Sequence, residues 1–142
     1  MQDQLFRVSE LPLEYDHLDI NLHKGGDAVL KINASSINVN MSGHTYFHTY
    51  TRLRLWGQCR RLSIHHAGNR VDVKTHWMQA DTVLVDTYTP PSIRNNSLIR
   101  VKVSDYLNAR IKGWSDVLYM GQPTIKKKEW SYGRLIDGNY YP

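Results

Sequence analysis

His44–Trp56, with the sequence HTYFHTYTRLRLW, alternates side chains of two kinds along its whole length. One set consists of Phe47, Thr49, Thr51, Leu53 and Leu55, and the other of Tyr46, His48, Tyr50, Arg52 and Arg54. Successive side chains of a β-strand point to opposite faces. The first set is therefore expected to pack into a core, and the second to form an aromatic and basic surface. This surface is the best candidate for a contact site.

The rest of the chain is also rich in strand-forming alternation. Further strands are predicted at 18–22, 28–33, 37–41, 62–64, 71–77, 82–88, 99–103 and 117–120. Gly25-Gly26 and Ala67-Gly68-Asn69 lie between pairs of strands and predict two antiparallel hairpins. In the second hairpin, Val71, Val73, Thr75 and Trp77 are expected to face the same way.

One segment has helical spacing. Ser104-Asp105 offers an N-cap, Tyr106, Leu107 and Ile111 have the spacing of one helical face, and Gly113 is a plausible C-cap. These signals predict a helix over 105–112. The fold class expected from the sequence is mainly β: an antiparallel β-sandwich or barrel of about eight strands with one short helix.

The length of 142 residues fits one domain that buries its own core. We assign residues 1–125 to this β-rich domain. Residues 126–142 form a basic, aromatic tail that is expected to dock on the domain or on a neighbouring subunit. The tail residues proposed for assembly are Lys126, Lys127, Lys128, Trp130, Tyr132, Tyr140 and Tyr141.

Catalytic and metal-binding patterns are weak. Cys59, the one cysteine, cannot form a disulfide within the chain, and is expected to be a free, packed thiol in a reducing compartment. Its neighbours Arg60 and Arg61 would lower its pKa if it were exposed. His44 and His48 lie too far apart along a strand to share a metal ion, so the seven histidines are interpreted as surface or half-buried groups. We expect no enzyme activity, no cofactor and no metal.

Basic and aromatic residues carry the strongest functional signal, together with a net charge of +5. The proposed contact residues are Tyr46, His48, Tyr50, Arg52, Arg54, Arg70, Lys74, Arg100 and Lys102. Tyr, Trp and Arg are the usual anchors of protein interfaces. Arginine and lysine on phosphates, with tyrosine stacked on bases, would suit nucleic acid equally. A merely solvated sheet face is the third reading.

We therefore expect a non-enzymatic structural protein of a virus or phage particle. It would associate with its own copies and with other particle proteins through sheet faces and the aromatic tail. The alternative is a nucleic-acid-binding β-barrel module. No run reaches the roughly 20 apolar residues that span a membrane, no small-molecule substrate is evident, and Met1–Glu10 lacks a signal-peptide pattern. The expected location is the virion or the host cytoplasm.

Overall fold

The computed structural model describes residues 13–23, 25–42, 50–68, 71–89, 97–130 and 133–140. Within these ranges the chain forms eight strands and one short 3₁₀ helix. They are β1 (Leu13–His23), β2 (Asp27–Ser42), β3 (Thr51–Ala67), β4 (Val71–Tyr88), β5 (Ser97–Lys112), β6 (Ser115–Met120), β7 (Thr124–Trp130), β8 (Arg134–Asp137) and η1 (Gly138–Tyr140). All the pairings between these strands are parallel.

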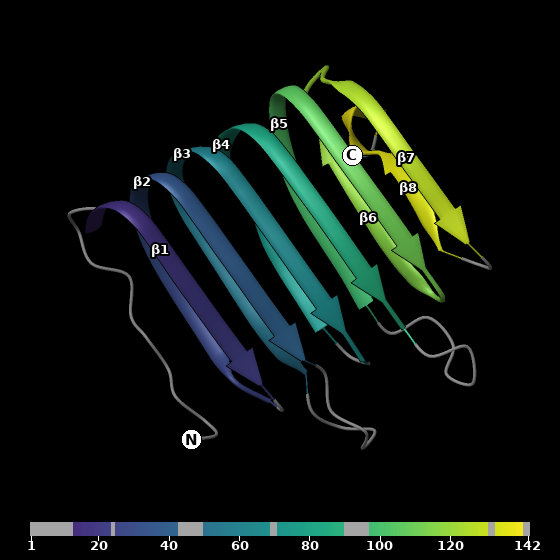
Figure 1. Cartoon of the computed structure of the whole chain (residues 1–142), viewed down its shortest axis with the longest axis horizontal. Helices are drawn as coiled ribbons and strands as arrows, with labels where there is room; N and C mark the ends of the chain where they lie inside the picture. Colours follow the sequence, from purple (N-terminus) through teal and green to yellow (C-terminus); the bar gives the residue numbers. More distant parts are fainter. Residues whose placement is uncertain are drawn as a thin grey trace.

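The strands wind into a β-solenoid of about five turns. Figure 1 shows that β2 to β5 each bend midway, so that their two halves lie in different layers. The first sheet contains the first halves of β2–β5 together with β6 and β8. The second sheet contains β1, the second halves of β2–β5 and β7. The pairing of β5 reflects this division, because residues 97–102 pair with β6 and residues 106–112 pair with β7.

Stacked aliphatic side chains fill the space between the sheets. On the second sheet, Ile37, Leu62, Val83 and Leu107 occupy matching positions on successive turns. On the first sheet the corresponding ladder is Leu53, Val73, Ile99 and Val117. All eight side chains are buried. Burying a side chain of this size contributes about 1.5–3 kcal/mol, so each turn is held mainly by its neighbours.

The prediction of an antiparallel sandwich or barrel is wrong, although most of the predicted strands exist. The alternation of inward and outward side chains is the same in parallel and antiparallel pairs, so it locates strands without orienting them. Gly25-Gly26 illustrates the error. His23 lies beside Ser42 on the second sheet, whereas Asp27 lies beside Arg52 on the first. The turn therefore carries the chain from one sheet to the other, and the turn between β3 and β4 does the same.

The predicted helix over 105–112 is also wrong, because this segment is the second half of β5. Leu107, Ala109 and Ile111 are all fully buried, which is the period of two expected of a strand. Asp105 is exposed where β5 bends between the sheets. The polar pair Ser104-Asp105 thus lies at a corner of the solenoid. In sequence, such a pair resembles the N-cap of a helix.

The C-terminal part continues the solenoid. β7 pairs with β5, and β8 pairs with β6. Lys126, Lys127 and Lys128 are exposed on β7. Tyr132 and Tyr141, and the side chains of Trp130 and Tyr140, lie outside the described residues. The boundary between residues 125 and 126 stays a prediction, as does the role of this segment in assembly. In the part of the chain described, no helix has the length and apolar character needed to cross a membrane.

Candidate binding surface

The predicted contact residues converge on the outer face of the first sheet. Those described there are Tyr50, Arg52, Arg54, Lys74, Arg100 and Lys102. Tyr46, His48 and Arg70 lie outside the described residues. Thr51, Leu53 and Leu55 point into the core and are fully buried, which confirms the inward face for the described part of this strand. The predicted strand residues from His44 to Thr49, including Phe47, lie outside the described residues. The parallel register, rather than a hairpin, brings the basic residues together.

Three cations form a row across consecutive turns. Arg54 pairs in register with Lys74, and Lys74 with Arg100. Neighbouring strands lie about 4.8 Å apart, so the row spans about 10 Å along the solenoid axis. Like charges placed directly opposite one another across strands are destabilising. The repulsion among Arg54, Lys74 and Arg100 is therefore expected to lower the stability of the fold.

Two tryptophans stack beside this row. Trp56 and Trp77 are partners in register, with ring centroids 4.6 Å apart and planes only 3° from parallel. Trp77 is 43% exposed, although it was expected to face the same way as Val73 and Thr75, which are buried. A recurring signal accompanies the pair in the sequence: Arg54-Leu55-Trp56 and Lys74-Thr75-His76-Trp77 each place a cation shortly before a tryptophan, one turn apart.

A bulge in β4 turns Trp77 outward. Thr75 pairs with Val101 and Ala80 with Val103, so four residues of β4 lie opposite the single residue Lys102 of β5. Met78 takes the inward position within the bulge and is fully buried. β-Bulges commonly re-aim a side chain near functional sites. Here the bulge presents an indole ring to solvent.

His76 lies within the same bulge, with its ring centroid 4.2 Å from that of Trp77. Burial lowers the pKa of His76 below its ordinary value, and the cations Arg100 and Lys74 lower it further, against a smaller opposing effect of Asp72. Burial is the largest cause, and the positive charge of this surface acts on the pKa of His76 in the same direction.

We name the set Arg54, Trp56, Lys74, Trp77, Arg100 and Lys102 the Trp–cation strip. Lys31 extends it on β2, since it is the register partner of Trp56. Within the described chain, Lys31, Arg54, Lys74 and Lys102 have no carboxylate within 4.0 Å. Arg100 is 3.9 Å from Asp72. Among the described residues, the strip thus combines an exposed indole, that of Trp77, with several cations of which Arg100 alone has a carboxylate within 4.0 Å.

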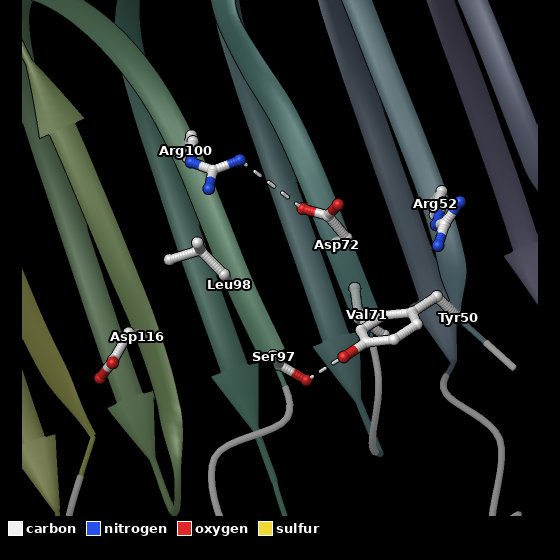
Figure 2. Close-up of a pocket in the computed structure, with 8 residues that line it drawn as sticks. All are labelled: Tyr50, Arg52, Val71, Asp72, Ser97, Leu98, Arg100 and Asp116. Carbon is white, nitrogen blue, oxygen red and sulfur yellow. Dashed lines mark hydrogen bonds and ion pairs between the residues drawn. The ribbon is translucent and has the colours of Figure 1, made fainter. Parts of the chain in front are cut away.

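A shallow groove of about 410 Å³ adjoins the strip at the beginning of the strands. Figure 2 shows Tyr50 reaching across it toward Ser97, with the Arg100–Asp72 pair above them. The groove is lined by charges of both signs, because Arg52, Asp72 and Asp116 belong to it together with Arg100. The strip beside it contains no acid, so an anion is favoured on the strip rather than in the groove.

The core offers little nucleophilic or metal chemistry among the described residues. Burial and the nearby Asp81 raise the pKa of Cys59 to about 12, so the neighbouring arginines do not activate this thiol. Its Sγ lies 3.7 Å from Sδ of Met78. No group of three or more His, Cys, Asp or Glu side chains in the described ranges converges on a metal position.

Buried polar groups gather at one end of the core, and the sequence did not reveal them. His66 was expected at the surface or half-buried, but only 4% of it is exposed. Its Nε2 lies 3.0 Å from the carbonyl oxygen of Gly68 and 3.3 Å from Oγ of Ser97, and its Nδ1 is hydrogen-bonded to Thr87. This cluster is enclosed, so its role is structural.

One family matches the chain. The model of the DUF2807 family, described as "Putative auto-transporter adhesin, head GIN domain", covers residues 7–123. This range includes β1 to β6 and therefore the whole Trp–cation strip. No curated protein and no solved structure matches the chain.

Proposed function

The chain belongs to the DUF2807 family, and on that basis we propose that it is a non-enzymatic adhesion domain that holds its target through the outer face of the first sheet. The observation that carries the proposal is the Trp56–Trp77 stack beside Arg54 and Lys74, in which Trp77 is exposed and Trp56 is half-buried. Large aromatic side chains and arginine dominate the energetics of binding surfaces. A solenoid suits the role, because its stacked turns give an extended surface.

The family match overturns the expectation of a virus or phage particle protein. The family match likewise gives no support to the nucleic-acid-binding alternative. Both hypotheses had assigned binding to the basic and aromatic face that forms the outer side of the first sheet. The description of the family as an adhesin head supports display outside the cytoplasm rather than in a virion or host cytoplasm. Burial of Cys59 is compatible with such display, since an inaccessible thiol is protected from oxidation. Self-association stays a prediction.

Adhesion can be measured with beads coated with the full chain. The beads are washed over layers of mucin, collagen and cultured epithelial cells, and those retained are counted against albumin-coated beads. We expect clear retention on at least one layer. The variant Trp56→Ala/Trp77→Ala should reduce retention to the albumin level, because it removes both stacked indole rings.

The matched control removes two polar side chains from the other sheet. Asn21→Ala/Asn40→Ala breaks a 3.0 Å hydrogen bond on the outer face of the second sheet, far from the strip. This control should adhere like the wild type. Retention on none of the layers, or equal retention of the tryptophan variant, would overturn the proposal.

A further inference from the structure

We propose that the ligand of the Trp–cation strip is an acidic polysaccharide that lies along the solenoid axis across β2 to β5. Its carboxylates would pair with Arg54, Lys74 and Arg100, and its sugar rings would contact the Trp56–Trp77 stack. The inference rests on the proposed adhesive function and names the class of ligand for the same surface.

The spacing of the cations favours a polymer with a regular charge repeat. Arg54, Lys74 and Arg100 advance by one turn each, which is about 4.8 Å. This step is close to the length that one pyranose unit adds to an extended chain. A polymer with one carboxylate on each sugar therefore places anions in register with the row. Such a ligand relieves the repulsion among the aligned cations.

The two tryptophans are the reason for proposing a sugar polymer and not merely an anion as the ligand. Each indole covers one face of the other, so a ligand lying along the axis meets the apolar edges of the two rings. The C–H groups of a pyranose can pack on these edges, whereas a bare anion gains little there. The two rings are held nearly parallel at 4.6 Å, so their exposed surface is already ordered before binding. A preordered aromatic surface loses little conformational entropy when it binds a ligand.

The surrounding residues set the place of the ligand. The row nearest the start of the strands lies on the far side of the cation row from Trp56 and contains three acids and one cation: Asp27, Asp72, Asp116 and Arg52. The acids outnumber the cation, so this row favours an anionic chain less than the cation row does. Asn33, Gln58 and Gln79 lie on the opposite side of the tryptophans, and their amides can bond sugar hydroxyls. The strip is thus bounded mainly by acids on one side and by neutral amides on the other.

The test is isothermal titration of the full chain with an oligomer of galacturonic acid at low salt. A neutral oligomannan and a poly-L-glutamate of equal charge serve as comparators. We expect the galacturonate to bind, the mannan to bind much more weakly, and the glutamate to be insensitive to the tryptophans. Binding should weaken as salt rises, since exposed charges are screened.

Two variants with the same loss of charge separate the strip from general attraction. Arg54→Gln/Lys74→Gln should weaken galacturonate binding at least about tenfold, which corresponds to ~1.4 kcal/mol. Arg61→Gln/Arg110→Gln removes two exposed cations from the second sheet and should leave the affinity unchanged. Trp56→Ala/Trp77→Ala should weaken binding of galacturonate but not of glutamate.

His76 gives an independent readout by NMR. A carboxylate placed near Arg100 and Lys74 offsets their effect on the imidazole, so saturation with galacturonate should raise the pKa of His76. Equal losses in the two charge variants, equal binding of glutamate in every variant, or no binding by the wild type would refute this ligand class. A chain that adheres in the bead assay but ignores galacturonate would refute the ligand class and leave the adhesion proposal standing.

Discussion

His66 is a titratable side chain placed inside the stack of aliphatic residues. In register it follows Met41 and precedes Thr87, both of which point into the core. A carbonyl oxygen only accepts hydrogen bonds, so the Nε2–H donates to Gly68 and Nδ1 accepts from the Thr87 hydroxyl. The imidazole is therefore held neutral. Burial lowers its pKa from 6.5 to about 4, although the Gly68 contact acts in the opposite direction.

The protein should lose stability in mild acid because of this residue. Between about pH 6.5 and 4 the unfolded chain protonates His66 while the folded chain does not. Stability is therefore full above this window and falls as the pH is lowered through it, by up to about 3 kcal/mol. Urea unfolding across this range should show the loss in wild type and a smaller loss in His66→Gln. His65→Gln, the outward-facing neighbour, should behave like the wild type. Parallel curves for all three proteins would contradict the assignment.

Individual side chains were predictable where alternation was unbroken. Thr51, Leu53 and Leu55 follow the pattern and are buried. Trp77 does not follow the pattern, because the bulge before Ala80 interrupts the alternation of inward and outward side chains in β4. No local sequence pattern reveals how many residues such a bulge contains. His66 was missed for another reason. Its burial depends on partners in two other strands, Thr87 and Ser97, as well as on the nearby Gly68, and only the folded chain brings these strands together.

At the level of the strands, a close approach between turns depends on a glycine. Gly57 of β3 has φ of 119°, and a Cβ atom there would lie 1.9 Å from the carbonyl oxygen of Ile32 in β2. The same arrangement recurs at Gly113 against Thr89. These glycines let the chain turn while successive turns keep the spacing of hydrogen-bonded strands.

Gly57→Ala should therefore destabilise the protein by at least about 2 kcal/mol, since it adds both left-handed strain and a backbone clash. The change is measured as the shift of the urea midpoint at constant slope. Gly26→Ala is the control. A Cβ there would meet only the flexible end of Leu22 at 3.3 Å, so the expected change is within about 1 kcal/mol. Similar losses for both variants would argue against the close approach at Gly57.

The positions of most strands could be predicted, but their pairing could not. Residues 28–33 and 37–41 were assigned as two strands and belong to the single bent strand β2. Gly25-Gly26 was assigned as a hairpin turn, which is its usual meaning between two alternating segments. Neither the bend nor the sheet on which the chain resumes has a local sequence signature. The prediction of a helix over 105–112 was wrong for a similar reason, because residues typical of a helix cap also occur where a solenoid strand bends from one sheet to the other.

For the whole molecule, the turns of the solenoid differ in length, so the repeat cannot be recognised from the sequence. Partners on successive turns differ by 19 residues between β1 and β2, 25 between β2 and β3, and 18 between β5 and β6. A fixed period is the sequence mark of repeat architectures, and this chain has none. The outward direction of the basic side chains was nevertheless predicted, because Arg52, Arg54, Lys74 and Arg100 face outward in either topology. Only the parallel register explains why they meet Trp56 and Trp77.

The register is thus the central claim, and NOE contacts between the backbones of β2 and β3 test it most directly. In the solenoid, Asp27 lies opposite Arg52 and Ser42 opposite Ala67, so every contacting pair differs by 25 in residue number. We expect NOE contacts along the whole ladder at this constant difference. Contacts whose residue numbers have a constant sum would show antiparallel pairing. They would contradict the solenoid and the binding surface built on it.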